Sequence, residues 1–434
     1  MIITNIGELV GIVPEGVLRK QGAEMSQVSS IRNAWLRIAP DGTIADFGPG
    51  SPVSPDSSGR ACSEPTLALT NRRLAAGSAG AAGAAEAEEV LDAEGGMVMP
   101  GFCDSHTHVV YAGSREGEFI DKINGLSYEQ IAARGGGILN SSDLLHETSE
   151  DELYRQSMQR VHEMMAKGSA AIEIKSGYGL NPEDELKMLR VIRRIKENVP
   201  ALIRSTFLGA HAVGRGYSHQ EYVQAVIDMM PKAAELADFV DVFCDQGFFT
   251  TDDCARILEA GARHGLKPKI HANELAQSGG VQVGVKYGAL SVDHLERSGE
   301  AEIEALKGSG TMPTMLPGSS FFLGIPYAKA KDYIQAGLGI ALASDYNPGS
   351  SPMGDMRFVM ALGCIKMRLS PSQAFNAVTL NSAYAMGVSR LTGSITPGKR
   401  ADLIITQPGW NLDRLPYLFQ TPFIKRVLTA GVSL

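Results

Sequence analysis

In Val98-Met99-Pro100-Gly101-Phe102-Cys103-Asp104-Ser105-His106-Thr107-His108, a short apolar run ends in two histidines. Alternate residues of an extended strand point to the same side, so both imidazoles can bind one metal ion. The alternative is a pair of solvent-facing or hydrogen-bonded histidines at a strand end, and the motif alone favours neither. The rest of the chain therefore decides between a metal site and a structural pair.

The composition is typical of a globular protein with one large core and a smaller second domain. The chain has 434 residues, 44% hydrophobic and 20% charged, with a net charge of -8 and no long basic run. Nucleic acid is therefore not an expected partner. No apolar stretch is long enough to span a membrane and the first residues do not resemble a signal peptide, so we expect a cytoplasmic protein. Five scattered cysteines indicate reduced thiols rather than disulfides.

Both ends of the chain contain short segments that are typical of β structure. Residues 35–38 and 43–46 predict a hairpin, and residues 393–405 and 426–431 predict short strands. We therefore expect a small β-sandwich domain built from both chain termini, at residues 1–95 and 389–434. At residues 50–87 the composition changes to Ser, Pro, Gly and Ala, which predicts an exposed, mobile insertion.

Apolar or β-branched runs recur eight times after residue 96, with amphipathic segments between them such as 183–197, 220–236 and 251–264. This alternation predicts an α/β fold, a (β/α)8 TIM-type barrel at residues 96–388 with its active site at the carboxyl ends of the strands. A Ser-Pro start also predicts a helix at 370–386. The expected strands are residues 98–104, 170–175, 202–210, 239–244, 268–271, 290–293, 311–316 and 340–345.

Five of the nine histidines lie at or just beyond the ends of these expected strands. In a barrel the strand ends meet at one mouth, so imidazoles from four separate strands would face a single pocket. This distribution favours the metal-site interpretation of the first two histidines. The five are His106, His108, His211, His271 and His294.

An economical ligand set for a catalytic metal ion is His106, His108, His271 and Asp345. Asp345 follows the apolar run 339–344, which places its carboxylate at the barrel mouth. By itself Asp345 would be interpreted as a helix cap or turn residue, because a loop sequence follows it. The histidines shift the interpretation toward a metal ligand.

Two further residues at strand ends have side chains suited to hydrolysis. Glu274 lies three residues after His271, where a carboxylate can act as general base toward water without being a ligand; a capping glutamate is the alternative. His294 can polarise a carbonyl as negative charge develops on its oxygen; the alternative is a structural histidine bonded to Asp293. With the other strand-end residues in view, we favour the catalytic role for both.

Lys175 ends the second expected strand and has three possible roles. It can be a carboxylated ligand between two metals, a charge partner or a substrate contact, and the bridging ligand is the least favoured of these.

Six runs of residues resemble the amidohydrolase superfamily. His-x-His at 106–108 specifies only the superfamily, whereas Lys-Ser-Gly-Tyr-Gly-Leu at 175–180 and His-Ala-Asn-Glu-Leu at 271–275 together resemble the branch that opens a cyclic amide in histidine degradation. The stretch 50–87 departs from this family because it is longer and richer in Ala and Gly. The similar runs are residues 100–108, 173–180, 207–211, 269–275, 292–296 and 344–350.

The resemblance implies one metal ion, zinc or iron, held by the four ligands named above without a carboxylated lysine, and it implies a homodimer. A guanidinium fork at Arg115 suits a propionate carboxylate, and a surface arginine in a polar loop is the alternative. The substrate contacts that the resemblance implies are Arg115, Tyr178, His211, Glu274, Asn347, Gly349 and Ser350.

The expected reaction is hydrolysis of the cyclic amide of 4-imidazolone-5-propanoate to N-formimino-L-glutamate. Glu274 takes a proton from water, His294 and the metal stabilise the oxyanion, and Glu274 or Asp345 protonates the leaving nitrogen. The first alternative is a related amidohydrolase or deaminase that acts on another nitrogen heterocycle. The second is a catalytically silent metal-binding barrel.

Overall fold

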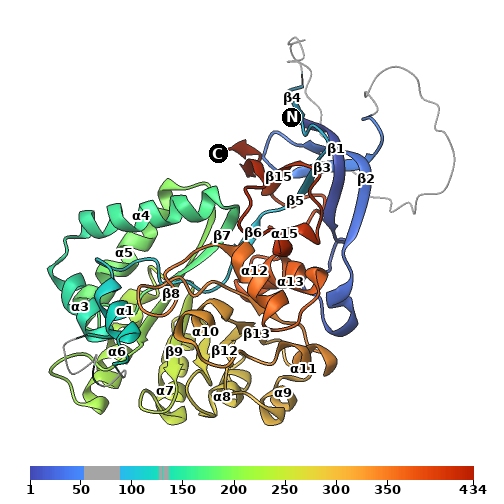
Figure 1. The fold of residues 1–434 in the computed structure, drawn as a ribbon. Coiled ribbons are helices and arrows are strands. Elements are labelled where there is room, and N and C mark those ends of the chain that lie inside the picture. Colours follow the sequence, from blue (N-terminus) through green and yellow to red (C-terminus); the bar gives the residue numbers. More distant parts are fainter. Residues whose placement is uncertain (53–87, 127–129, 131–135) are drawn as a thin grey trace, which may run out of the picture.

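The structure is a computed structural model that describes residues 1–52, 88–126, 130 and 136–434. Residues 53–87, which make up nearly all of the insertion expected at 50–87, lie outside the described part. Figure 1 shows a barrel of strands and helices with a β-rich domain at one end, and both chain termini lie in that domain. Among the described residues, no helix has the length and apolarity that a membrane span requires.

The larger sheet is the expected barrel, with parallel strands in the order β14-β13-β12-β11-β9-β8-β7-β6. It closes where β6 meets the end of β14: His108 N donates to Tyr346 O at 2.9 Å, and Asp345 N donates to His106 O at 3.0 Å. Each expected strand has a counterpart, so the barrel is confirmed. The strands are β6 (Phe102–Asp104), β7 (Ser169–Lys175), β8 (Leu202–Ala210), β9 (Phe239–Cys244), β10 (Lys267–Pro268, paired with β9), β11 (Ile270–Ala272), β12 (Ser291–His294), β13 (Met312–Met315) and β14 (Ala341–Leu342).

Helices cover the outside of the barrel (Figure 1). The hydrophobic core lies between them and the strands, where residues such as Ile172, Val240 and Leu342 are fully buried. The helices are α1 (Glu116–Ile123), α3 (Ile138–Glu147), α4 (Glu150–Ala166), α5 (Pro182–Asn198), α6 (His219–Ala233), α7 (Thr251–Arg263), α8 (Gly280–Lys286), α9 (Glu300–Leu306), α10 (Pro317–Leu323), α11 (Ala330–Gln335), α12 (Met356–Ile365), α13 (Pro371–Val378), α14 (Leu380–Ala385), α15 (Arg414–Tyr417) and the 3-10 helix η1 (Gly22–Ser26).

Helix α13 begins as the sequence predicts but ends early. Ser370 caps its first turn by accepting from Gln373 N at 3.2 Å, and Pro371 occupies the first helical position. The helix expected at 370–386 is nevertheless two helices, because Thr379 has φ −122° and ψ −97°, outside the helical region. The single-helix prediction is therefore wrong at that residue.

The strands from both termini form one eight-stranded sheet in the order β17-β16-β15-β5-β1-β2-β3, with β4 paired to β1. The predicted hairpin is present, since β2 and β3 pair antiparallel from Ala34↔Pro49 to Ile38↔Ile44. The β-rich domain built from both termini is confirmed, and its strands are linked by hydrogen bonds into a single sheet. The strands are β1 (Ile2–Ile12), β2 (Ser29–Ile38), β3 (Ile44–Pro49), β4 (Val90–Asp92), β5 (Gly96–Pro100), β15 (Leu403–Pro408), β16 (Ile424–Thr429) and β17 (Val432–Ser433).

The run expected as one strand at 98–104 is divided at Gly101. Its first half is β5 of the terminal sheet, and its second half is β6 of the barrel. Gly101 N donates to Asp402 O at 2.8 Å, and a Cβ on Gly101 would lie only 2.7 Å from Ala170 Cβ. Only glycine allows this close approach. The histidines at 106 and 108 therefore follow a segment whose first half lies in the terminal sheet and whose second half lies in the barrel.

Candidate metal centre and active site

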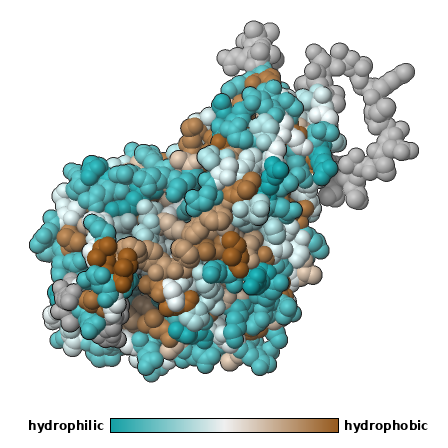
Figure 2. Space-filling model, in the orientation of Figure 1, coloured by the Kyte–Doolittle hydropathy of each residue, from teal (hydrophilic) through white to brown (hydrophobic). Residues whose placement is uncertain are grey.

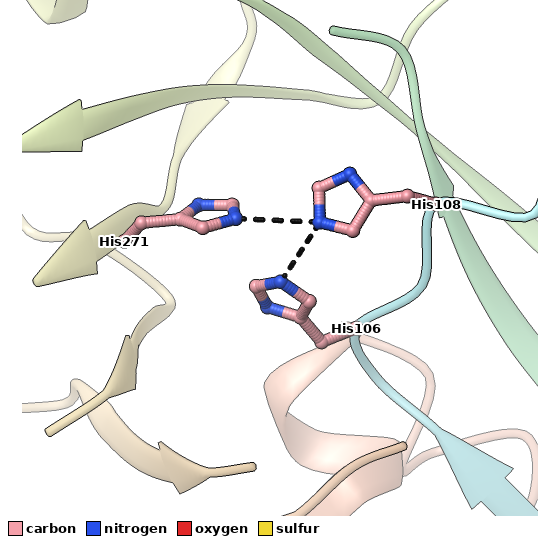
Figure 3. Close-up of side chains that lie close together, drawn as sticks. All are labelled: His106, His108 and His271. Carbon is pink, nitrogen blue, oxygen red and sulfur yellow. Dashed lines mark hydrogen bonds between the residues drawn. The ribbon is translucent and has the colours of Figure 1, made fainter. Parts of the chain in front are cut away.

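Three histidines from two strand ends converge at the mouth of the barrel. His106 and His108 follow β6, and His271 lies in β11. Figure 3 shows their imidazoles pointing toward one another: His108 Nε2 lies 3.2 Å from His106 Nε2 and 3.4 Å from His271 Nε2. Asp345, beyond β14, places its Oδ1 3.6 Å from the Nε2 atoms of both His106 and His108. The structure thus brings the four expected ligands together in one buried group, called here the ligand cluster.

The chemistry of the ligand cluster fits a metal ion. Tetrahedral ligands about 2.0–2.1 Å from zinc lie about 3.4 Å from one another, close to the separations of 3.2 to 3.6 Å in the cluster. Burial lowers the pKa of His106 and that of His108 well below the ordinary value, so both rings are neutral. Buried nitrogen lone pairs that face each other are stabilised by a cation between them. Imidazole and carboxylate suit iron as well as zinc.

Carboxylates behind two of the histidines orient the rings. His106 Nδ1 donates to Asp293 Oδ2 at 2.6 Å, and His271 Nδ1 lies 2.9 Å from Asp241 Oδ2. Such pairs fix the nitrogen that faces a metal and raise its basicity. The alternative in which Asp293 bonds to His294 is therefore wrong. The His294 ring instead faces Glu274 and Glu296, and its φ of 84° departs from the extended backbone of a strand.

Lys175 is a charge partner of these carboxylates. Its Nζ donates to Glu173 Oε1 at 2.6 Å and to Asp241 Oδ2 at 2.9 Å, and the side chain is fully buried. Burial alone would lower the pKa of Lys175, but the two carboxylates raise it above its ordinary value, so the ammonium remains charged. A charged amine does not become carboxylated, which disfavours the bridging-ligand interpretation. Lys269 is a second buried cation and donates to Glu173 and to Ser105 O.

Glu274 and His294 form an ion pair beside the ligand cluster. Glu274 Oε2 lies 3.7 Å from His294 Nε2, and His294 Nδ1 lies 3.6 Å from Glu296 Oε2. Burial disfavours the charged form of His294, but the two carboxylates raise its pKa well above the ordinary value. Burial raises the pKa of Glu274 to about 7, although the positive His294 opposes this shift. A proton acceptor tuned near neutral pH thus lies next to a cation that can stabilise an oxyanion.

Arg115 reaches the loop that follows Asp345. Its Nη2 donates to Glu118 Oε2 at 2.5 Å, and its buried Nε has no hydrogen-bond partner within the described part of the chain. A Cβ on Gly349 would lie 2.4 Å from Arg115 Nη1, so the guanidinium packs directly on this glycine. Lys122 Nζ donates to Gly349 O at 3.2 Å. Two cations therefore lie at the Gly349 end of the site.

The segment that begins at Arg115 also exposes apolar side chains. Phe119, Ile120 and Ile123 of α1 are exposed, and Figure 2 shows a brown patch over this helix. The Phe119 ring stacks on Phe322 of α10 with 5.4 Å between their centroids. The α1 helix is thus held against α10 by apolar contact, and Arg115 precedes its first turn.

Tyr178 and His211 lie against His108. The His211 ring stacks on His108 with 5.2 Å between the centroids, and the Tyr178 centroid is 6.0 Å from that of His108. His211 Nδ1 donates to Gly177 O at 3.0 Å, and burial lowers the pKa of His211 to about 4, so its Nε2 is a free acceptor. Burial raises the pKa of Tyr178, which keeps its hydroxyl protonated as a donor.

Asn347 shapes the loop that carries Gly349 and Ser350. Its Nδ2 donates to Asp345 O at 2.6 Å and to Ser350 Oγ at 2.8 Å. Its Oδ1 accepts from Gly349 N and Ser350 N, each at 2.8 Å. Both polar ends of the amide are therefore used within the loop, and direct substrate contact by Asn347 stays a prediction.

A model of the Amidohydrolase family matches residues 97–433, which include the barrel and every residue of the site. The chain belongs to the amidohydrolase family. As an amidohydrolase, the protein is a hydrolase. The expected resemblance and fold are thus confirmed.

Curated relatives of this amidohydrolase are similar over nearly their whole length. Imidazolonepropionase of Flavobacterium johnsoniae is 48% identical over 435 residues, covering 99% of this chain and 98% of that protein. Imidazolonepropionase of Christiangramia forsetii is 47% identical over 436 residues, covering 99% of each chain. Among solved structures, a triazine hydrolase variant has a TM-score of 0.72 at 13% identity, covering 100% of this chain and 94% of that chain. E. coli guanine deaminase has a TM-score of 0.71 at 13% identity, covering 100% and 98%.

Two buried carboxylates of the site were not identified from the sequence. Asp241 and Glu173 lie inside apolar strands, in Phe-Val-Asp-Val-Phe-Cys and Ala-Ala-Ile-Glu-Ile-Lys, and both are fully buried. Buried carboxylates are rare unless they are paired. An isolated acidic residue within an apolar strand is therefore the signal that could have found them.

Proposed function

We propose that this amidohydrolase hydrolyses the cyclic amide of 4-imidazolone-5-propanoate to N-formimino-L-glutamate, a step of histidine degradation. The similarity to full-length relatives named Imidazolonepropionase supports this substrate. The observation that carries the proposal is the position of the Arg115 guanidinium on Gly349, four residues after the ligand Asp345. A heterocycle with a carboxylate arm can be held by Arg115 while its ring lies at the ligand cluster.

The residues that would hold one metal ion, zinc or iron, are His106, His108, His271 and Asp345. When bound, such an ion supplies Lewis acidity and lowers the pKa of a bound water toward about 7. The donor atoms form two overlapping groups that share His106, one with His108 and His271 and one with His294 and Asp345, which supports a metal site at this position.

Glu274 and His294 have complementary roles in the proposed hydrolysis. Glu274 Oε2 accepts a proton from the attacking water, whose oxygen forms a bond to the ring carbonyl carbon. The His294 imidazolium donates to the carbonyl oxygen as negative charge develops on it. The ring C–N bond then breaks, and the leaving nitrogen receives the proton held by Glu274, with Asp345 as the second possible donor. The sum is one water added across one C–N bond.

The remaining residues bind and orient the substrate. Arg115 pairs with the propionate carboxylate, the Tyr178 hydroxyl donates a hydrogen bond and His211 Nε2 accepts one from a ring N–H. Gly349 and Ser350 contribute backbone and hydroxyl groups beside Arg115. These side chains are buried or half-buried, so each contact forms with little competition from water.

The test is an ultraviolet assay of imidazolone consumption with metal-loaded protein, combined with detection of N-formimino-L-glutamate and metal analysis. Arg115→Ala should raise KM roughly 10- to 100-fold for the propionate substrate, as expected for loss of a charged hydrogen bond. It should have little effect on 4-imidazolone without the carboxylate arm. Equal effects on both compounds would favour an amidohydrolase or deaminase of another heterocycle.

Glu274→Gln and His294→Asn separate this proposal from a silent metal-binding barrel. Both variants should retain metal and lose turnover. A fully metal-loaded wild-type protein that leaves the imidazolone unchanged would contradict the proposal.

We also propose that the protein is a cytoplasmic homodimer. The free thiols of Cys103, Cys244 and Cys254 are buried, which agrees with a reducing compartment. The proposal of a dimer rests on the resemblance to the family. Light scattering should then give a mass twice that of the 46.3 kDa chain.

A further inference from the structure

Asp245 directly follows β9, and its buried carboxylate faces the loop that carries Glu274. Its Oδ2 accepts from Glu274 N and Leu275 N, each at 2.8 Å. Its Oδ1 accepts from Ala276 N at 3.0 Å and from Gln246 N at 2.7 Å. Three successive backbone N–H groups of the Glu274 loop therefore converge on one charged group.

The two ends of the Glu274 loop are held by other hydrogen bonds: Ser278 Oγ donates to Cys244 O at 2.6 Å and Arg297 N donates to Asn273 O at 2.8 Å. The loop begins at Asn273, whose φ of 58° turns the chain away from β11, and the next helix, α8, starts only at Gly280. Within the described part of the chain, the N–H groups of Glu274, Leu275 and Ala276 donate to no backbone carbonyl. Hydrogen bonds to a carboxylate are roughly twice as strong as those between neutral groups. The hydrogen bonds to Asp245 therefore hold the backbone N–H groups of Glu274 and the two residues after it.

We propose that Asp245 is a positioning residue of the reaction, which fixes the Glu274 carboxylate beside His294 and the ligand cluster. This inference rests on the proposed role of Glu274 as the base. Among the described residues, the hydrogen bonds of the Asp245 carboxylate come from backbone N–H groups of this loop and of Gln246, so it acts through Glu274 rather than on the substrate. Because a base must be held within hydrogen-bond reach of the water it deprotonates, a loosened loop costs turnover more than binding.

Asp238 provides a matched control because it stands at the opposite end of the same strand. It precedes β9, accepts from Ser205 N at 3.0 Å and pairs with Arg204 at 2.7 Å. Substituting either aspartate by asparagine removes one charge. In Asp245→Asn the amide N–H₂ also has to face a backbone N–H, because both carboxylate oxygens accept from such groups, whereas in Asp238→Asn the amide oxygen can still accept from Ser205 N. Of the two substitutions, Asp245→Asn is the one at the end of β9 that faces the site.

The experiment compares wild-type protein with Asp245→Asn, Asp245→Glu and Asp238→Asn, all loaded with metal. Asp245→Asn should lower kcat 10- to 100-fold with KM changed less than about twofold and metal content unchanged. Asp245→Glu should recover part of the lost kcat because it keeps the carboxylate. Asp238→Asn should leave kcat unchanged. Unchanged kcat in Asp245→Asn, or an equal fall of kcat in both asparagine variants, overturns the inference.

Amide hydrogen exchange supplies a readout that does not depend on turnover. In Asp245→Asn the amides of Glu274, Leu275 and Ala276 should exchange faster than in Asp238→Asn. If these amides exchange faster in Asp245→Asn while wild-type protein fails to hydrolyse the imidazolone, the role of Asp245 in holding the loop is supported and the proposed reaction is wrong. If exchange at these three amides is the same in both variants, Asp245 does not hold the loop and the inference fails.

Discussion

His106 depends on a residue that is far away in the sequence. Its Nδ1 donates to Asp293, 187 residues further along the chain, and this bond leaves Nε2 to face the ligand cluster. Asp293 itself lies 3.8 Å from both Lys175 Nζ and Lys269 Nζ. The basicity of the ligand is therefore set by a buried network of charges beneath it.

Asp293→Asn should weaken metal binding by about 10- to 100-fold, because the ring of His106 loses its charged acceptor. Competition with a chelator of known affinity measures this change. Asp238→Asn, at the end of β9 that lies away from the site, is the control for loss of one carboxylate. Equal metal affinity of the Asp293→Asn and wild-type proteins would show that the pair is only structural.

The shifted pKa of Glu274 predicts a pH dependence of turnover. A general base works only when ionised, so kcat/KM should fall as the pH drops through the pKa of Glu274 and the carboxylate takes up a proton. Burial places that pKa at about 7, and a bound cation moves it lower, toward the ordinary value of 4.5. A pH profile of kcat/KM should therefore show an acid limb between these two values. A profile that stays flat below pH 4.5 would remove Glu274 as the base.

A substitution at Gly349 should have a specific effect on substrate binding. In Gly349→Ala the new Cβ would lie 2.4 Å from Arg115 Nη1, so the flexible guanidinium has to move while the backbone does not. We expect KM to rise several-fold, with kcat and the melting temperature nearly unchanged. Steady-state kinetics and thermal unfolding check this. A large loss of stability would show that the glycine serves the loop rather than Arg115.

At the scale of elements, single charged side chains hold the loops of the site. Arg160 of α4 donates to the carbonyls of Val109, Tyr111 and Gly113 and lies over the Tyr111 ring at 3.5 Å from its centroid. Glu185 of α5 plays the corresponding part for another loop by accepting from three backbone N–H groups. Those groups belong to Gly177, Gly179 and Leu180. The loops that carry Arg115 and Tyr178 are thus held by charged side chains of α4 and α5, respectively.

Arg160→Met should loosen the segment between His108 and Arg115 while keeping most of the apolar stem. We expect a loss of about 1.5–3 kcal/mol in the free energy of unfolding from the charged hydrogen bonds, and a rise in KM. Denaturant unfolding and kinetics measure the two effects. Arg155→Met, earlier on α4 and exposed, is the control, because within the described part of the chain its side chain bonds to Glu152 of the same helix.

The sequence predicted which residues meet at the barrel mouth but not these loop contacts, for a physical reason. Strand ends in a parallel barrel converge by geometry, so His106, His108, His271 and Asp345 could be placed together from the hydrophobic pattern. The contact of Asp245 with Glu274 depends instead on the detailed path of a loop with no periodicity. A pattern of apolar residues carries no information about that path.

At the scale of the whole molecule, the barrel and the terminal β domain follow from the sequence, whereas their junction does not. The apolar run at 98–104 has a single hydrophobic pattern, and nothing in that pattern assigns β5 and β6 to different sheets. The division at Gly101 depends on contacts with Asp402 and Ala170, which come from distant parts of the chain. Hydrophobic periodicity reports burial, but it does not report which sheet a strand joins.

Metal removal tests the site in the intact molecule. The expected ligands come from three different strand ends, so a bound ion stabilises the folded state relative to the unfolded chain, by about 2.7 kcal/mol at a free concentration of 100 times Kd. Dialysis against a chelator should lower the melting temperature by several degrees, and added zinc or iron should restore it. Identical melting curves with and without metal would indicate that no ion is held in the fold.

Backbone hydrogen bonds that close the barrel are made by residues of the ligand cluster. His106 and Asp345 share one of these bonds, and His108 makes the other with Tyr346. In a chain whose last strand has not docked, the histidines lack their carboxylate and the donor atoms stand apart. If the ligand cluster binds a metal ion, tight retention of that ion therefore indicates that β6 and β14 have paired and the barrel is closed. Any variant, however far from the site, can be screened for correct folding by the metal it carries after purification.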